Sequence, residues 1–555
     1  MGALELITII MQILGGMGTF LVGMKILSEN LTRLAHSKLR SILGKTANSR
    51  FAGVGIGAVV TIIGQSSAFT TVMVVGLVNA GIMTLFQATA IIMGANIGTT
   101  LTAWVLSLGD FNVTVFFLCL AAVGVFMTMF SKKEKVKSAG NAVAALGLIF
   151  VGLEFMSGAF SEKQFPAFYE AMRDLLQKAA KSPLLLLLFG LVLTALIQSS
   201  TAVTALTLSL SAFFTGTGNA VYFIIIGSNI GTCVTALISS LGASPNAKRA
   251  AVIHFLFNFF GAIIFTLILL FWKGFADTVL VTLFRENSAM QIAMFHTMFN
   301  VINTALFLPF VKGFVWMAEH LVPAKKSDMG APNSSEGLFM ELDDRLLRSP
   351  SVALGYLYQE TGKVFSFAMN TLDTSFGAFL EKDVDAAALV GEQNRELADA
   401  NRRGVSYLVK LASQPLVMED EKTISSLHYV LNDIMRVGEL ADNVTKYTRH
   451  YVEDELEFSD EFLEMTKAMF EKLKELYGKS LATFLNKDFS GLKAVDELEE
   501  EIDGDRKRLV ERHIERLNEG KCQPQNSSVF INLVGNLERA ADHITFIAHS
   551  IEQKN

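Results

Sequence analysis

Long apolar segments separated by short polar ones fill the first 320 residues of the chain. Seven of these segments are uninterrupted and long enough to cross about 30 Å of hydrocarbon as helices. Two more, 51–80 and 184–210, carry polar residues near their middle. The pattern predicts an all-helical membrane domain over residues 1–320. The uninterrupted segments lie near residues 5–28, 85–108, 112–130, 138–158, 218–240, 250–272 and 289–317.

Residues 342–555 keep a helical period but mix apolar positions with many charged ones, which is typical of a soluble helical bundle. The mean hydropathy of +0.41 hides this division. Of the 53 acidic and 47 basic residues, 41 and 26 lie in 331–555, which leaves 12 acidic and 21 basic residues in 1–330. A basic membrane domain is thus joined to an acidic soluble one. The Pro- and Gly-containing stretch 321–341 is the predicted linker.

Polar motifs recur at one fixed offset inside the apolar domain. The Gln-Ser-Ser triplet at 65–67 returns at 198–200, and Gly-Ala-Asn-Ile-Gly-Thr at 94–99 returns as Gly-Ser-Asn-Ile-Gly-Thr at 227–232, each 133 residues later. Polar side chains at membrane depth are costly and often mark a ligand site. The alternative is close helix packing with interhelical hydrogen bonds. The constant offset favours a binding site built from two related halves.

Basic loops predict the orientation of the first half. Loops 33–50 and 131–137 are rich in Lys and Arg, which favours a cytoplasmic position for both. The chain between them must then cross the membrane an even number of times. Because 85–108 and 112–130 supply two crossings, we expect 51–80 to enter and leave by the same side as a re-entrant hairpin, broken at its polar triplet.

A second, weaker repeat predicts that the two halves are inverted. The Gly-rich segment 18–23 resembles 147–152, and on this topology the two copies run in opposite directions. Repeat 1 would cover about 5–130 and repeat 2 about 138–272, with 289–317 as an extra span. Inverted repeats with broken helices that meet near the midplane are typical of secondary transporters. The soluble domain would then lie in the cytoplasm.

The repeated motifs are polar but uncharged. Residues 51–109 and 182–247 contain no Asp, Glu, Lys, Arg or His. The N–H groups of a half-helix that starts after a Ser-Ser break suit an oxyanion, and unwound carbonyl and amide oxygens suit sodium. Because an unpaired anion in a low-dielectric site is costly, co-bound cations are expected. The serines have no base nearby in sequence, so an enzyme is not predicted.

Several ionisable residues in the spans leave two interpretations open. Lys25 and Glu154 occupy equivalent repeat positions, and they either pair across the pseudo-twofold axis or reach toward their own interfaces. The sequence from His254 to Asn258 is echoed from His296 to Asn300. This echo indicates related packing roles, with a proton relay as the alternative.

These motifs resemble the type II sodium/phosphate cotransporter family in its bacterial form with a fused tail. The resemblance spans most of residues 1–320. It implies sodium-driven import of inorganic phosphate across the bacterial cytoplasmic (inner) membrane, with both Gln-Ser-Ser regions forming the transport site. The implied phosphate-binding residues are Ser66, Ser67, Ser199 and Ser200. The residues expected to bind sodium or brace the hairpins are Gln65, Thr70, Thr71, Asn96, Thr99, Gln198, Thr201, Thr204, Asn229 and Thr232.

The first triplet departs from the second at the next position. Ala68 follows the first and Thr201 the second, so one hydroxyl is missing and the sodium stoichiometry is left open.

The soluble domain resembles a PhoU-like domain, a tandem of two three-helix units linked to phosphate regulation. Segment 378–383 matches 483–488 at an offset of 105. In that family a Glu-Arg-x-x-Asp motif on a helix holds a metal, and here Glu538 and Asp542 complete it, whereas the first copy begins with Met435. A divalent metal and an ordinary exposed acidic pair are both compatible with this motif. The resemblance implies a cytoplasmic regulatory partner, and no nucleic-acid partner is expected.

Two other functions remain alternatives to sodium-coupled import by alternating access. The chain could be a membrane-anchored phosphate sensor in which the tail signals, or a passive anion channel. Only a coupled transporter would concentrate phosphate against its gradient.

Overall fold

A computed structural model describes residues 2–35, 49–111, 114–214, 217–285, 287–323, 342–414, 416 and 418–552. Within these ranges all regular structure is helical, which confirms the predicted all-α class. The described residues form two compact units. The membrane unit comprises those up to 323 together with Asp343–Arg348, and the tail unit comprises Leu342 and those from Ser349 onward. Most of the predicted linker and of the first basic loop lies outside the described residues.

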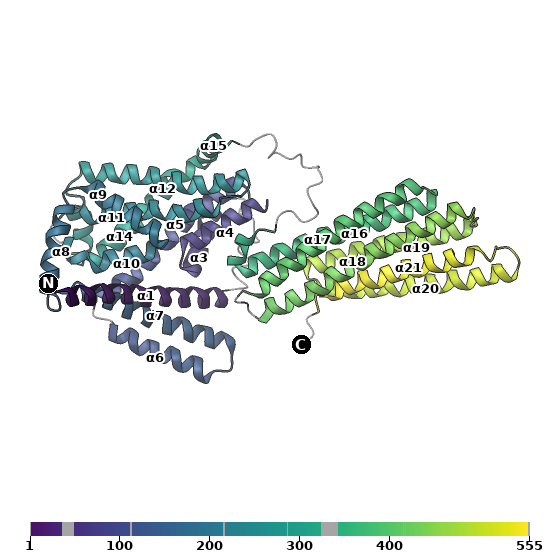
Figure 1. Cartoon of the computed structure of the whole chain (residues 1–555), viewed down its shortest axis with the longest axis horizontal. Coiled ribbons are helices and arrows are strands. Elements are labelled where there is room, and N and C mark those ends of the chain that lie inside the picture. Colours follow the sequence, from purple (N-terminus) through teal and green to yellow (C-terminus); the bar gives the residue numbers. More distant parts are fainter. Residues whose placement is uncertain are drawn as a thin grey trace. The chain divides into compact units, whose positions relative to one another are not determined.

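The first repeat forms helices that follow the predicted segments closely (Figure 1). The second interrupted segment becomes two helices, as the first does, because each polar triplet breaks the backbone hydrogen-bond ladder. The helices of the first repeat are α1 (Ala3–Leu34), α3 (Arg50–Gly64), α4 (Ser67–Asn79), α5 (Leu85–Ser107) and α6 (Thr114–Phe130).

The second repeat and the extra span complete the membrane unit. Their helices are α7 (Glu134–Ala159), α8 (Pro166–Ala179), α9 (Pro183–Ile197), α10 (Ser200–Ser209), α11 (Ala220–Ser239), α12 (Pro245–Phe271), a short α13 (Thr282–Phe284), α14 (Ser288–Phe307) and α15 (Val311–Leu321).

Six helical segments among the described residues are long and apolar enough to cross a membrane: α1, α5, α7, α11, α12 and the stretch Ser288–Leu321. The pair α8 and α9, bent by 113°, makes a seventh if it is one broken span. At 17 residues, α6 is shorter and extends roughly 26 Å. The structure is therefore that of a multi-pass membrane protein.

Glycines let the outer helix of each hairpin lie directly against the next long helix. A Cβ added at Gly57 would lie 1.9 Å from the Ile91 carbonyl oxygen, and one at Gly190 would lie 2.1 Å from that of Ile224, exactly one repeat later. Val54 lies against Gly94, and Ala58 lies against Gly98. The residue numbers in α3 and α5 increase together along the contact, so the two helices are parallel. The contacts of α9 with α11 show the same parallel direction. The intervening α4 and α10 must therefore return the chain, which makes both segments re-entrant hairpins.

The first helices of the two repeats, α1 and α7, pack closely in opposite directions (Figure 1). Gly16 lies against Gly152 and Met156, whereas Gly23, further along α1, lies against Ile149, earlier in α7. This antiparallel register confirms the predicted inversion, because α1 and α7 are the equivalent helices of the two repeats.

A short 3-10 helix at Asp344–Arg348 belongs to the membrane unit although the sequence pattern groups it with the tail. Leu346 is fully buried and lies against Gly76 of α4. Arg345 Nη2 donates to the Leu241 carbonyl oxygen at 3.3 Å. The chain is thus attached to the first hairpin just before the first tail helix begins.

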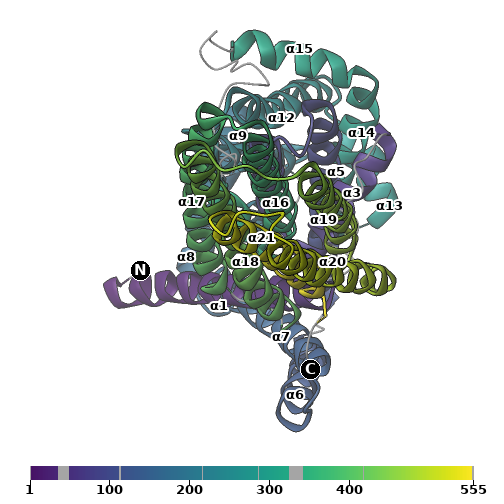
Figure 2. The ribbon, with the colours of Figure 1, turned by 90° about the vertical axis from the view of Figure 1, so that its right-hand side faces the viewer.

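The tail is two three-helix units that pack on each other through α18 and α21 and through α16 and α19. Figure 2 views these helices nearly end-on. The 105-residue repeat appears in the backbone, because Lys382 (φ 55°) and Lys487 (φ 53°) end the first helix of each unit in the left-handed conformation. The helices are α16 (Pro350–Glu381), α17 (Val384–Ala412), α18 (Met418–Glu453), α19 (Asp460–Asn486), α20 (Leu492–Asn518) and α21 (Asn526–His549).

Candidate functional site

The two hairpin breaks have the same local structure. Gln65 (φ 50°) and Gln198 (φ 57°) each end a helix in the left-handed region. Ser66 Oγ then accepts the Phe69 N–H at 3.2 Å, and Ser199 Oγ accepts the N–H of residue 202 at the same distance. Serine is a favoured residue at a helix start because its oxygen satisfies one of the free N–H groups there. Each hydroxyl retains its own hydrogen for a ligand.

The two breaks, which come from opposite repeats, line one cavity of about 190 Å³. Eight of the fourteen residues predicted for the transport site contribute to its wall. They are Gln65, Ser66, Ser67, Gln198, Ser199, Ser200, Thr201 and Thr232.

Four helix ends contribute their backbone groups near this cavity. The last turns of α3 and α9 leave carbonyl groups without a helical partner, and the first turns of α4 and α10 leave N–H groups. The carbonyl end of a helix carries partial negative charge and the N–H end partial positive charge. One such carbonyl, that of Gly64, accepts a hydrogen bond from Ser28 Oγ of α1 at 2.7 Å. The arrangement can therefore hold an anion and a cation side by side.

Six predicted residues do not line this cavity, and four of them make hydrogen bonds through their side chains. Asn96 Nδ2 donates to the Ile92 carbonyl at 2.9 Å, and Asn229 Nδ2 donates to that of Ile225 at 2.8 Å. The hydroxyls of Thr70 and Thr61 are 2.8 Å apart, which joins the two arms of the first hairpin. The Thr61–Thr70 contact joins the arms of the first hairpin, the two asparagine bonds lie within α5 and α11, and the Thr71 hydroxyl has no partner among the described residues. The full set is Thr70, Thr71, Asn96, Thr99, Thr204 and Asn229.

Among the described residues, Lys25 of α1 is the one charged residue in the cavity wall, and its side chain is 77% exposed. The sequence predicts no charge here, because no ionisable residue lies near either motif along the chain. Lys25 Nζ lies 3.9 Å from Glu29 Oε1, and within the described part of the chain no ion pair joins it to Glu154. Its repeat position beside a Gly-rich segment was the sequence signal, and α1 reaches the cavity beside the first hairpin, where Ser28 Oγ donates to the Gly64 carbonyl.

Thr102 is a second residue that the motifs do not identify. Its hydroxyl donates to Gln65 Oε1 at 3.0 Å, while Gln65 Nε2 donates to the Ile62 carbonyl at 2.6 Å. Both ends of the glutamine amide are thus held, so its orientation at the break is fixed.

Comparison with known proteins identifies the membrane unit. Residues 19–158 and 160–306 match the Na+/Pi-cotransporter family in two consecutive segments, one per repeat. The chain belongs to the Na+/Pi-cotransporter family. Residues 466–551 also match the PhoU domain, which confirms the resemblance of the tail.

Similar proteins include relatives of the membrane unit, of the tail and of the whole chain. The uncharacterised protein YqeW of Bacillus subtilis is 30% identical over 310 residues, 55% of this chain and 96% of that protein. The putative inorganic phosphate export protein YjbB of Escherichia coli is 22% identical and covers 98% of this chain and 97% of its own length. A PhoU homologue of Thermotoga maritima is 22% identical over 37% of this chain and 84% of that protein. No solved structure matches the chain.

The acidic pair of the PhoU domain does not fit a metal site. Glu538 Oε1 lies 3.4 Å from Arg506 Nη1, so that carboxylate already has a cationic partner. Burial raises the pKa of Glu538, and the negative charge of Asp542 adds to this effect. In the tail ranges that the structure describes, no group of three or more His, Cys, Asp or Glu is arranged to hold a metal. The predicted divalent metal at Glu538 and Asp542 is therefore unsupported.

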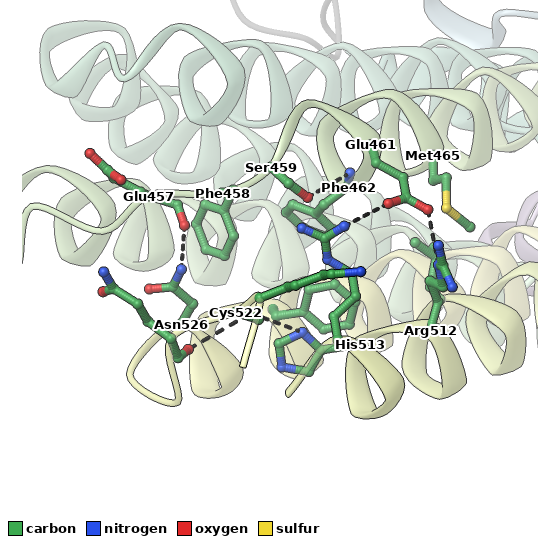
Figure 3. A pocket seen from close by; sticks show the side chains of 15 residues that line it. Glu457, Phe458, Ser459, Glu461, Phe462, Met465, Arg512, His513, Cys522 and Asn526 are labelled. Atoms are coloured by element: carbon green, nitrogen blue, oxygen red, sulfur yellow. Dashed lines mark hydrogen bonds and ion pairs between the residues drawn. The ribbon is translucent and has the colours of Figure 1, made fainter. Parts of the chain in front are cut away.

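A cavity of about 270 Å³ lies in the second half of the PhoU domain, between the start of α19, the end of α20 and the start of α21 (Figure 3). Glu461 accepts from Arg512 Nε at 3.0 Å and from Arg516 Nη1 at 2.7 Å. These two arginines lower the pKa of Glu461. Phe462 and Phe530 form part of the wall, so the cavity joins aromatic and cationic groups.

Proposed function

We propose that this cotransporter-family protein moves inorganic phosphate into the cell together with sodium, by alternating access between its two inverted repeats. The observation that carries the proposal is the shared cavity, to which opposite repeats contribute equivalent broken helices and hydroxyls. Broken helices that meet at the interface of inverted repeats are typical of secondary transporters.

Phosphate would bind at the N–H ends of α4 and α10. The hydroxyls of Ser66, Ser67, Ser199 and Ser200 would donate to its oxygens, as would the free N–H groups of these helix starts. Lys25 adds one positive charge from α1.

Sodium would bind where α3 and α9 end. A phosphate ion near neutral pH carries more negative charge than one lysine neutralises, and uncompensated charge in a low-dielectric site is costly. Backbone carbonyls at the helix ends and the oxygens of Gln65, Gln198 and Thr201 are suited to a hard monovalent cation. The remaining predicted threonines and asparagines would brace the two hairpins.

Uptake of labelled phosphate into proteoliposomes tests the coupling. With an inward sodium gradient we expect accumulation above the external phosphate concentration, and with choline in place of sodium only leakage. Accumulation that is indifferent to sodium would disprove the coupling. Equilibration without accumulation would instead identify a passive channel.

Export is the second candidate, because the YjbB relatives are named as putative inorganic phosphate export proteins. The direction of a coupled carrier follows the summed gradients of its ions, so an inward sodium gradient drives import. Vesicles preloaded with phosphate decide the question. If phosphate leaves against its gradient while sodium is higher outside, the protein is not an importing symporter.

The PhoU domain would regulate transport from the cytoplasmic side of the inner membrane by binding a regulatory protein. The positive loops predict this orientation. Cysteine accessibility in inside-out vesicles tests this orientation in a protein whose Cys119 and Cys522 are replaced. A cysteine introduced at exposed Lys132 reports the loop, and one at exposed Lys493 reports the tail.

A further inference from the structure

The cavity in the second half of the PhoU domain has no part in the proposed transport. It lies where the start of α19, the end of α20 and the start of α21 come together (Figure 3). Its volume of about 270 Å³ is close to the lower end of the range for small-molecule sites, about 300 Å³. The groups that line it indicate which kind of molecule would fit.

One part of the cavity wall is a series of flat rings. The ring centroids of Phe458 and Phe462 are 4.9 Å apart, and those of Phe462 and Phe530 are 4.5 Å apart. The His513 ring stacks on Phe530 at 4.1 Å, with an angle of 13° between the planes. Phe458 is half-buried and the other three rings are buried, so Phe458 is the ring most accessible to a bound molecule. Such a wall suits a flat aromatic group.

A second part of the wall carries two arginines one turn apart on α20. Glu461 accepts hydrogen bonds from Arg512 Nε and Arg516 Nη1, which holds both guanidinium groups at the cavity. A guanidinium group has five N–H donors in a planar fork. Among the described residues Arg516 donates through Nη1 alone, so its Nε and Nη2 groups are left for an anion. Burial lowers the pKa of His513 and the positive charge of Arg516 lowers it further, so this charge acts beside the rings.

Arg516 is also the least compensated cation of the wall. Arg512 and Lys521 each have an acidic partner outside the wall, Glu515 at 3.1 Å and Glu519 at 3.0 Å. Within the described ranges, Arg516 pairs only with the carboxylate that it shares with Arg512. An anion in the cavity would therefore bind best at Arg516.

Asn526 supplies an acceptor that lacks a donor. It lies at the start of α21 in the same wall and is 2% exposed. Its Nδ2 donates to the Glu457 carbonyl, whereas its Oδ1 has no hydrogen-bond partner among the described residues. The Glu457 carboxylate is at an exposed position, where water and salt screen its charge. Because buried polar atoms are nearly always paired, the Asn526 oxygen indicates a ligand with an N–H or O–H group.

A molecule that matches the cavity combines a flat ring, an anionic group and a hydrogen-bond donor. A nucleoside monophosphate has all three, because its base stacks on aromatic side chains, its phosphate accepts from arginine and its ribose donates through hydroxyls. We propose that this cavity binds a mononucleotide, with the base on Phe458 and the phosphate on Arg516. The inference goes beyond the proposed transport and does not depend on it.

Equilibrium dialysis of radiolabelled AMP, GMP and UMP against the purified full-length protein tests the proposal. All three are used because stacking tolerates any base. We expect at least one of them to bind saturably. Its nucleoside and inorganic phosphate, which each carry one half of the ligand, should displace it roughly tenfold less well than the unlabelled nucleotide does. If none of the three binds, or if the nucleoside displaces as well as the nucleotide, the inference is wrong.

Two variants and a matched control locate the binding. Arg516→Gln and Phe458→Leu should each raise the half-saturating nucleotide concentration roughly tenfold or more, because they remove the phosphate donor and the stacking face. Arg508→Gln is the control, since Arg508 lies on the same helix and is also paired with a carboxylate, that of Asp505, but does not line the cavity. If Arg516→Gln binds the nucleotide as tightly as Arg508→Gln does, the cavity is not the site.

Cys522 gives a second measurement that needs no change in the binding groups. It is half-buried in the cavity wall, whereas Cys119 is exposed and Cys233 is buried. In a Cys119→Ser background, modification of Cys522 by N-ethylmaleimide should slow several-fold when the nucleotide is bound, and Arg516→Gln should remove this protection. A nucleotide that binds without protecting Cys522 binds elsewhere, which would overturn the inference. Neither measurement involves phosphate uptake, so failure here leaves the proposed transport standing.

Discussion

At the scale of residues, the cavity shared by the two hairpin breaks is lined by hydroxyls at two helix starts. Ser66 and Ser199 line the cavity, and their oxygens also cap the starts of α4 and α10. Ser67 and Ser200 lie in the same wall and make no hydrogen bond through their hydroxyls among the described residues. The second pair is therefore the better probe of ligand binding, since its removal leaves the caps intact.

Replacing Ser67 and Ser200 with Ala should weaken phosphate binding while the fold is kept. A hydrogen bond to a charged partner contributes about 1.5–3 kcal/mol, so we expect the half-saturating phosphate concentration to rise roughly tenfold or more per residue. Labelled phosphate uptake measures it. Thr207→Val in α10 is the control, because this buried hydroxyl bonds the Val203 carbonyl and does not line the cavity. If Thr207→Val raised the half-saturating phosphate concentration as much as Ser67→Ala and Ser200→Ala, the two serines would not be phosphate ligands.

In the PhoU domain, Glu499 gives a prediction on pH. Burial, together with the nearby charge of Asp542, raises the pKa of Glu499. A carboxyl whose pKa is raised on folding favours the folded state at low pH and loses that contribution as pH rises through the folded pKa. At pH 7 Glu499→Gln should therefore stabilise the fold and slow hydrogen–deuterium exchange in α20 and α21. Below the ordinary pKa of Glu the same substitution should slow exchange less.

Glu511→Gln, at an exposed position of the same helix and not among the charges that raise the pKa of Glu499, is the control and should leave exchange unchanged. If Glu499→Gln slowed exchange more at acidic pH than at pH 7, the pH dependence would have the opposite sign and would contradict the interpretation.

At the scale of elements, glycine contacts hold each re-entrant hairpin against the long helix of its repeat. Gly57 of α3, which faces α5, and Gly190 of α9, which faces α11, occupy equivalent positions. In both, the partner is a backbone carbonyl that cannot move aside without moving its helix. The hairpin tips are therefore positioned by backbone contact over several turns, which keeps the two breaks at the same cavity.

Gly57→Ala should separate α3 from α5 and abolish most transport. Overpacking a core commonly costs about 1–3 kcal/mol, and backbone contact leaves little room for relaxation. We expect a lower Tm in detergent and at least a tenfold loss of phosphate uptake. Gly55→Ala, on the same helix with no atom within 4 Å of the added Cβ, should behave as wild type. If Gly57→Ala and Gly55→Ala take up phosphate at equal rates, transport does not depend on the close contact between α3 and α5.

At the scale of the whole molecule, the chain joins a transport unit to a PhoU domain through residues 343–348. Buried Leu346 on α4 attaches the chain to the first hairpin, which is one wall of the cavity. The last described segment of the membrane unit, just before the tail begins, is therefore packed against the first hairpin.

Truncation after Arg348 should leave a membrane unit that still accumulates phosphate. Truncation after Glu341 removes Leu346 as well and should lower Tm, because it exposes the α4 surface that Leu346 covers. Uptake and thermal unfolding of both truncations measure this. If the longer truncation product binds phosphate but does not accumulate it, the chain is better described as a sensor.

Much of this architecture was predictable because it follows from local chemistry and from a repeat. Apolar length predicted the spans, basic loops predicted the hairpins, and the 133-residue offset paired the two breaks. The breaks at the two triplets and the antiparallel α1 and α7 follow from those patterns, whereas the left-handed Gln65 and Gln198 and their serine caps were not predicted. The predicted features depend on neighbouring residues or on an internal comparison, so one sequence suffices for them.

Only the tertiary structure decided which distant side chains meet. It brought Lys25 from α1 into a cavity whose own segments are uncharged, paired Glu538 with Arg506, and placed Phe458 and Arg516 in the wall of one cavity. Each outcome depends on how two helices rotate and register against each other. That geometry is set by packing summed over many contacts, and no single segment of sequence encodes it.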